Sequence, residues 1–252
     1  MKSEEFDAIT HSSSAENGSQ EKLVEMMKNS PIPDDELLAN MGLYLTSKNL
    51  SRYLFFYEIY KKVVNTHGII IEFGTRWGQT ISLLLALRGI FEPFNRVRKI
   101  VGFDTFSGLA GMSEKDSGDS NSVDGDFGVS GRYEEYLEKI LMYQEELNPI
   151  NHIRKFELIK GDVVQTLPGY LEKHPETIIS MAVFDMDIYT PTKAALEVIQ
   201  PYLFKGSILV FDELCDNVFP GETTALKEVM NIRDLQICRM PMTSRLSYFE
   251  VQ

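Results

Sequence analysis

The sequence is poor in cysteine and contains no long apolar run. Its 252 residues include two cysteines, Cys215 and Cys238, which have neither the CxxC spacing of a zinc or redox site nor the density of a disulfide scaffold. No stretch of about 18 apolar residues is present to form a membrane helix, and the polar N-terminus lacks the apolar segment of a signal peptide. These absences predict a cytoplasmic protein with free thiols and no membrane partner.

Positive charge is also scarce. The chain has 25 Lys and Arg against 37 Asp and Glu, a net charge of −12, so it is a poor candidate for binding nucleic acid through phosphate contacts. The deficit is local: residues 1–36 contain nine acids and three lysines, and residues 113–126 contain five acids and one lysine. Because 43% of the residues are hydrophobic, the remainder is expected to fold around an ordinary core.

Composition divides the chain into three parts. Residues 1–30 are rich in Ser, Glu and Asn, which predicts a flexible acidic N-terminal tail. Residues 31–66 are predicted to be an N-terminal helical segment, since aromatic and aliphatic residues recur at helical spacing between Asn49 and Val64. Residues 67–252 are then predicted to form one α/β domain.

Short apolar runs alternate with helical patterns through this domain. The predicted strands are 69–73, 100–103, 156–159, 178–184 and 208–211, and the predicted helices between them are 80–90, 133–147, 164–172 and 192–203. Such alternation is typical of a mostly parallel sheet with helices on both faces. Two further runs, 235–240 and 246–251, predict a C-terminal antiparallel hairpin that brings the sheet to seven strands.

In sheets of this class, ligands bind at the carboxyl ends of the strands. The first strand is followed by Gly74 and Gly78, which permit a tight turn and a close backbone approach to a ligand. Asp104 ends the second strand, where an acid can hold the hydroxyls of a ribose or cap the next helix. Asp162 follows the third strand and is placed either to accept from an adenine amino group or to cap a helix.

The fourth and fifth strands end in carboxylates. Asp185 and Asp187 lie on one side of an extended segment, and Asp212 and Glu213 follow the next strand. Four converging carboxylates repel one another unless a cation lies among them, and oxygen ligands suit Mg²⁺. The four histidines lie in the N-terminal segment or just before strands, so a carboxylate is the expected proton acceptor.

Taken in order, these segments resemble a known family. The motifs IEFGTRWGQT, GFDTFSGL, GDVVQTLP, FDMDIYTPTKAAL and GSILVFDEL resemble the class I S-adenosylmethionine-dependent methyltransferases, and more narrowly the metal-dependent sugar O-methyltransferases of the macrocin O-methyltransferase type. The resemblance covers residues 49–252 and implies a Rossmann-like fold. It departs at Glu213, where the family often has a second aspartate.

The resemblance also implies roles for individual residues. The cofactor, S-adenosylmethionine, leaves as S-adenosylhomocysteine. The residues implied to bind it are Glu72, Gly74, Thr75, Arg76, Asp104, Thr105, Asp162, Val163 and Asp185. Asp185, Asp212 and Glu213 would hold a divalent cation, expected to be Mg²⁺, and Asp187 would be the general base.

The family resemblance predicts a sugar-containing small molecule as the acceptor and a homo-oligomeric enzyme. Two alternatives remain at this point: a catechol-type O-methyltransferase acting on vicinal phenol hydroxyls, and a non-catalytic cofactor-binding protein. The FDMD segment also imitates the D-x-D of haloacid-dehalogenase-type phosphatases and of glycosyltransferases. Its place on the fourth strand disfavours the phosphatase, and a glycosyltransferase would leave FDEL and the final hairpin unexplained. The Gly-, Ser- and Asp-rich residues 112–131 predict a lid over the cofactor, with a solvated surface loop as the alternative.

Overall fold

The computed structural model describes residues 12–118 and 122–252, which fall into two compact units. The first unit is Met1–Leu54 and the second is Phe55–Gln252, so the boundary lies inside helix α3 (Ser47–Val63). The boundary predicted from the sequence lies at residue 66 instead. The difference arises because the C-terminal half of α3 carries five buried apolar side chains that belong to the core of the second unit.

The first unit is helical. It contains α1 (Ser14–Lys28), α2 (Asp34–Leu37) and the 3₁₀ helix η1 (Leu38–Tyr44). The structure thus differs from the tail predicted over residues 1–30, of which residues 1–11 lie outside the described part. A capping box begins α1: the Ser13 hydroxyl accepts from the Glu16 N–H, and the Glu16 carboxylate accepts from the Ser13 N–H. This reciprocal pair stabilises the start of a helix that the polar composition of the segment does not indicate.

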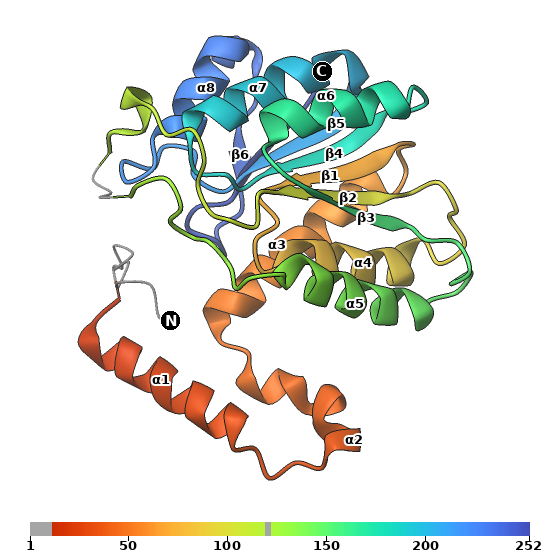
Figure 1. The fold of residues 1–252 in the computed structure, drawn as a ribbon, viewed down its shortest axis with the longest axis vertical. Helices are drawn as coiled ribbons and strands as arrows, with labels where there is room; N and C mark the ends of the chain where they lie inside the picture. The colour runs from red at the N-terminus through yellow and green to blue at the C-terminus, as the bar shows by residue number, and fades with distance from the viewer. Residues whose placement is uncertain (1–11, 119–121) are drawn as a thin grey trace. The chain divides into compact units, whose positions relative to one another are not determined.

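The second unit contains a seven-stranded sheet of order β3-β2-β1-β4-β5-β7-β6 (Figure 1). Five strands are parallel, and β7 pairs antiparallel with both β5 and β6. The prediction of a mostly parallel seven-stranded sheet ending in an antiparallel hairpin is confirmed. The strands are β1 (Ile69–Phe73), β2 (Ile100–Asp104), β3 (Phe156–Lys160), β4 (Ile179–Phe184), β5 (Leu203–Phe211), β6 (Cys238–Arg239) and β7 (Ser247–Glu250).

Helices cover both faces of the sheet. Figure 1 shows α3, α4 and α5 on one face and α6, α7 and α8 on the other. Their bounds in the second unit are α4 (Gln79–Phe91), α5 (Tyr133–Glu146), α6 (Val163–Lys173), α7 (Tyr189–Ile199) and α8 (Gly221–Val229), with 3₁₀ turns η2 (Glu114–Asp116), η3 (Gln200–Tyr202) and η4 (Ile232–Asp234). Helix α8 is not among the helices predicted from the sequence.

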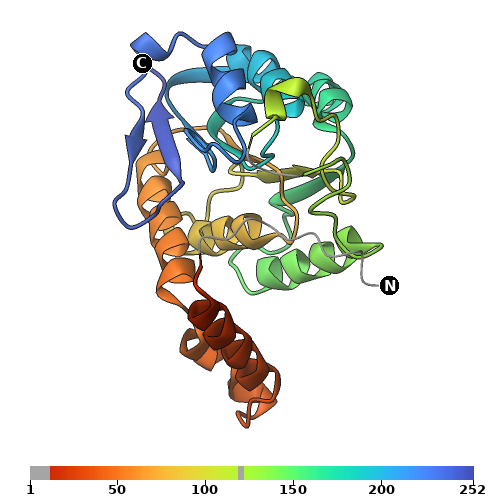
Figure 2. The ribbon, with the colours of Figure 1, turned by 90° about the vertical axis from the view of Figure 1, so that its left-hand side faces the viewer.

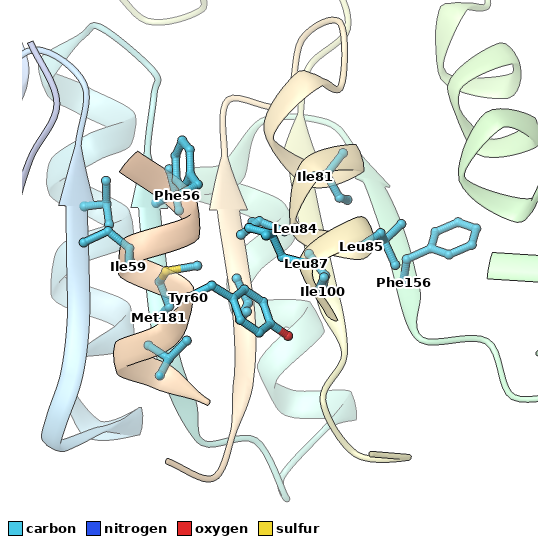
Figure 3. Close-up of a cluster of buried hydrophobic side chains, with 14 of the residues drawn as sticks. Phe56, Ile59, Tyr60, Ile81, Leu84, Leu85, Leu87, Ile100, Phe156 and Met181 are labelled. Carbon is cyan, nitrogen blue, oxygen red and sulfur yellow. The ribbon is translucent and has the colours of Figure 1, made fainter. Parts of the chain in front are cut away.

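Each face has its own apolar core. On one face the buried side chains of α3 and α4 pack over β1, β2 and β4, as Figure 3 shows for Tyr60, Leu84 and Met181. On the opposite face, phenylalanines at the ends of neighbouring strands pack ring against ring, with 4.7 Å between the centroids of Phe184 and Phe211. Burial on both faces explains why the central strands read as continuous apolar runs.

The C-terminal hairpin closes one edge of the sheet. Figure 2 shows β6 and β7 beside α3, and the rings of Phe55 and Tyr248 lie 6.2 Å apart. In the antiparallel register, Phe211 at the end of β5 faces Ser247 at the start of β7. The loop that precedes β7 therefore reaches the same edge of the sheet as the carboxyl end of β5.

A buried arginine links several elements at the amino ends of the parallel strands. Arg98 is 1% exposed, and its guanidinium donates to the Glu92 carboxylate at 2.9 Å, the Ser180 hydroxyl at 2.5 Å and the Gly68 carbonyl at 2.5 Å. Tyr60 also donates to Glu92, at 2.7 Å. This arrangement links α3, α4 and the starts of β1, β2 and β4 through charge-assisted bonds.

Replacing Arg98 by methionine is expected to lower the free energy of unfolding by about 3–5 kcal/mol, because the buried Glu92 carboxylate loses its cation. Urea denaturation measures this loss. The matched control is Arg96→Met at an exposed position, expected to change stability by less than about 0.5 kcal/mol. Equal stability of the two variants would contradict the structural role of Arg98.

Candidate active site

The carboxyl ends of β1, β2, β4 and β5 are level with one another. Phe73 pairs in register with both Phe103 and Phe184, and Phe184 pairs with Phe211. The ladder continues one residue further, since the N–H of Asp185 donates to the Phe73 carbonyl at 2.9 Å and that of Asp212 to the Phe184 carbonyl at 3.1 Å. The loops that follow therefore start at one edge of the sheet, as the sequence analysis predicts.

Gly74 brings two of these loops into direct contact. Its φ is 89°, in the left-handed region that favours glycine. A Cβ at this position would lie 1.8 Å from the Asp185 carbonyl oxygen. Only glycine allows the β1 loop to cross so close to the β4 loop, so the glycine-rich turn adjoins the acidic segment.

Asp104 organises the glycine-rich turn. Its carboxylate accepts from the N–H of Arg76 at 2.7 Å and from the N–H of Phe106 at 2.6 Å. Burial raises the pKa of Asp104, and these two backbone bonds oppose the rise. Thr75 is 4% exposed, and its hydroxyl is buried with no hydrogen-bond partner among the described residues. Asp104 thus fixes the backbone of the turn after β1, and the Thr75 hydroxyl is buried beneath that turn, over Gly102 of β2.

The other predicted cofactor residues occupy the same edge or lie just beneath it. Glu72 is buried on β1 and Val163 is buried at the start of α6. Asp162 caps α6, because its carboxylate accepts from the Val164 N–H at 2.9 Å. The Thr105 hydroxyl donates to the Gly108 carbonyl at 2.7 Å and so stabilises the turn after β2. The helix-cap reading of Asp162 is confirmed, and an adenine contact stays a prediction.

The residues between β2 and α5 include the predicted lid, of which residues 119–121 lie outside the described part. In this segment the Phe127 ring lies 4.8 Å from the Arg76 guanidinium and 5.9 Å from the Phe219 ring. It therefore contacts both the β1 loop and the β5–α8 loop. That residues 112–131 move as a lid over the cofactor stays a prediction.

Three carboxylates converge beside the glycine-rich turn that follows β1. Asp185, Asp187 and Glu213 each offer an oxygen, and these oxygens lie within 4.8 Å of one another. Asp212 is not in this trio, although the sequence analysis predicts it as a ligand and places Asp187 outside the ligand set. The structure thus brings the four acids to one place and groups Asp187, rather than Asp212, with the other two.

The cluster is electrostatically crowded. Burial, reinforced by the charge of Asp212, raises the pKa of Asp187 to about 6. Burial and the charges of Asp187 and Asp212 raise the pKa of Glu213 well above its usual range. Carboxylates forced together in this way favour either protons or a cation.

Two further residues of the cluster escaped the sequence analysis. Glu222, in the first turn of α8, is wholly buried, and its pKa is raised well above the usual range, first by burial and then by the charges of Asp187 and Asp185. Arg245, from the loop before β7, contacts Glu213 at 3.2 Å and Asp216 at 2.9 Å. Two features of the sequence could have indicated them: Glu222 is an acid that follows Pro220-Gly221 at a helix start, and Arg245 is a lone arginine in the predicted hairpin turn.

The donor set suits a hard divalent cation. All three converging groups supply carboxylate oxygens, which Mg²⁺, Mn²⁺ and Ca²⁺ prefer. Glu213 Oε2 is buried and has no hydrogen-bond partner among the described residues. An ion held by Asp185 and Glu213 would satisfy that oxygen and neutralise the mutual repulsion, so the residues present fit a metal.

Two solved structures of the calicheamicin methyltransferase CalS11 are similar to the whole chain. One is 37% identical with a TM-score of 0.93, and the other, the apo form described as a TDP-rhamnose 3′-O-methyltransferase, is 35% identical with a TM-score of 0.85. Each alignment covers 98% of this chain and 99% of CalS11. The chain belongs to the class I S-adenosylmethionine-dependent sugar O-methyltransferases. It is therefore an O-methyltransferase enzyme, as the motifs predict.

A more distant structure, that of the O-methyltransferase NovP, is 14% identical over 94% of this chain and 99% of NovP, with a TM-score of 0.58. At that identity it supports the fold alone. A scan against protein-family models and a search of curated proteins give no match. Among the described residues, no helix combines the length and apolarity needed to cross a membrane.

Substituting Gly74 by alanine tests the contact between the two loops. The positive φ alone should cost about 1–2 kcal/mol of stability. The clash with the Asp185 carbonyl must also displace a loop, so binding of S-adenosylhomocysteine, measured by calorimetry, is expected to weaken at least about tenfold. Gly169→Ala in α6, with open space around its Cβ and no positive φ, is the matched control and should bind normally. Normal binding by Gly74→Ala would contradict a close contact between the β1 and β4 loops.

Proposed function

We propose that this enzyme methylates a ring hydroxyl of a nucleoside-diphosphate sugar during natural-product biosynthesis. The support is the similarity to CalS11, which acts on TDP-rhamnose and matches this chain nearly end to end. The same similarity disfavours a phenolic acceptor, because the matching structures of substantial identity are of a sugar-modifying enzyme. The acceptor hydroxyl is proposed to have a neighbouring hydroxyl, as a two-oxygen chelate at the acidic cluster requires.

The glycine-rich turn and the neighbouring strand ends are proposed to bind S-adenosylmethionine, which supplies an electrophilic methyl group on a sulfonium and leaves as S-adenosylhomocysteine. Asp104 keeps lone pairs for ribose hydroxyls while it holds the Arg76 and Phe106 N–H groups. Glu72, Gly74 and Thr75 line the methionine end, and Asp162 and Val163 flank the adenine. Arg76, Thr105 and the Asp185 backbone complete the pocket.

The acidic cluster is proposed to hold the acceptor and to remove its proton. Asp185 and Glu213, with Asp212 as the third predicted ligand, would bind a divalent ion, expected to be Mg²⁺, which when bound lowers the pKa of a chelated hydroxyl. Asp187 would take the hydroxyl proton on a carboxylate oxygen as the new bond forms. Without an ion, burial and the charge of Asp212 raise the pKa of Asp187 to about 6, and a bound cation would lower it, so the carboxylate would be ionised and able to accept a proton at neutral pH.

One observation carries this proposal: the backbone of the glycine-rich turn contacts the backbone of the acidic cluster. Gly74 abuts the carbonyl of Asp185, and Asp185 itself belongs to the carboxylate trio. A methyl donor bound on the first and a hydroxyl bound at the second would therefore be neighbours. Alignment of donor and acceptor is the main task of an enzyme that catalyses an in-line displacement.

The proposed roles are tested by comparing Asp187→Asn with Glu213→Gln. Asparagine is isosteric and tolerates the left-handed φ of 64° at position 187. Asp187→Asn should lower kcat at least about 100-fold, the order attributed to a positioned base, while Mn²⁺ binding followed by electron paramagnetic resonance persists. Glu213→Gln should lose Mn²⁺ binding, and EDTA should abolish turnover of the native enzyme.

TDP-rhamnose and related TDP-sugars are the first acceptors for these assays, with simple catechols as the matched alternative. Full turnover by Asp187→Asn would show that another group accepts the proton. Loss of Mn²⁺ binding in Asp187→Asn would instead make Asp187 a ligand. Turnover unaffected by EDTA would remove the metal from the proposal and leave the methyltransferase activity standing.

A further inference from the structure

Asp187 lies at the centre of a strained three-residue turn. Its φ is 64°, and the N–H of Ile188 donates to the carbonyl of Met186 at 2.7 Å across it. A γ-turn with positive φ at its central residue is the rarer and more strained form, and strain of this kind persists only where the surroundings hold it. The groups that hold this turn therefore determine where the Asp187 carboxylate lies.

Glu222 holds the turn from the side of α8. Its Oε1 accepts from the N–H of Met186 at 3.2 Å, and its Oε2 accepts from the N–H of Glu213 at 3.2 Å. The side chain is 0% exposed. One carboxylate thus connects the loop after β4 to the loop after β5 and sets the spacing between the acids that these loops carry.

Asp116 holds the turn from the other end. It belongs to η2, in the segment between β2 and α5, and is 4% exposed. Its Oδ1 accepts from the N–H of Tyr189 at 2.6 Å, and its Oδ2 accepts from the N–H and hydroxyl of Ser113 at 2.7 and 2.9 Å. The residue before α7, Ile188, supplies no side-chain cap, so Asp116 provides it from a distant part of the sequence.

The contact with Asp116 leaves no spare room. A Cβ on Gly221, the first residue of α8, would lie 2.3 Å from Asp116 Oδ1 and 2.5 Å from the Tyr189 nitrogen. Beside it, Lys115 forms an ion pair with Glu228 and lies 4.0 Å from the centre of the Tyr189 ring. Segment 113–118 is therefore docked against the starts of both α7 and α8.

We propose that Asp116 and Glu222 are positioning residues for catalysis, which hold the Asp187 turn by accepting from the N–H groups on either side of it. The proposal rests on the proposed role of Asp187 as the base. Through Asp116, the placement of that base depends on the docking of residues 113–118 against α7 and α8. If Asp116 only capped α7 and stabilised the fold, the position of Asp187 would not depend on that docking.

The first test removes each acceptor. Asp116→Ala and Glu222→Leu should lower kcat for methyl transfer to TDP-rhamnose about 10- to 100-fold, since small displacements of a reacting group have costs of this order. In Asp116→Ala the dissociation constant of S-adenosylhomocysteine should stay within about twofold, because the hydrogen bonds of Asp116 go to Ser113 and Tyr189 and not to the glycine-rich turn. Asp116→Asn should recover most of kcat, since its amide oxygen can still accept from Tyr189.

The second test removes the donor instead. Tyr189→Pro deletes the N–H at the first position of α7, where proline is well tolerated, whereas Tyr189→Ala removes the same ring and keeps the N–H. Tyr189→Pro should lower kcat as Asp116→Ala does, and Tyr189→Ala should stay within about threefold of the native enzyme. This pair also decides the question if Asp116→Ala does not fold.

A third measurement does not depend on turnover. Hydrogen exchange at the amide of residue 186 should accelerate at least tenfold in Glu222→Leu, which has no acceptor for it, and that of residue 189 in Asp116→Ala. Native kcat in Tyr189→Pro, or in folded Asp116→Ala, while Asp187→Asn is inactive would overturn the positioning role and leave the base in place. Equal loss of kcat, cofactor binding and melting temperature would also overturn it. Turnover by Asp187→Asn would instead remove the base itself.

Discussion

The parallel register of β1, β4 and β5 is the constraint on which the site depends. Because Phe73, Phe184 and Phe211 lie at one level, the chain leaves three strands at the same edge and can place a glycine turn and two acidic loops side by side. The phenylalanines that pack on one another beneath this edge exclude water from its underside. A slip of one residue would turn the acids toward the helices.

Crowding of carboxylates is the cost of this arrangement. Asp185, Asp187 and Glu213 converge within 4.8 Å, and Glu222 is buried behind them. Among the described residues, Arg245 contacts Glu213 directly, while Arg76 and Arg245 both oppose the rise in the pKa of Asp187. The fold tolerates such repulsion at one edge because apolar packing on both faces, and charge-assisted bonds around Arg98, secure the rest of the sheet.

The strands were predicted correctly from the sequence, whereas two helices were not. The strands from Ile69 to Phe211 were found because β-branched apolar runs carry their signal locally, and Asp104, Asp185 and Asp187 followed from the rule about strand ends. Helix α8 was missed because its nine residues carry only a short apolar stripe. Helix α1 was missed because the polar composition of residues 1–30 indicated a tail, although Ser13 and Glu16 have the S-x-x-E spacing of a capping box.

The sequence by itself determined the order of strands and helices, the glycine turn and the acids at the strand ends, since each depends on residues close together in the chain. Tertiary structure alone decided that Asp187 rather than Asp212 joins Asp185 and Glu213, that Arg245 reaches Glu213, and that Asp116 and Glu222 hold the turn between Met186 and Tyr189. The physical reason is distance along the chain: Asp116 accepts from a residue 73 positions away, and no local pattern encodes such a contact.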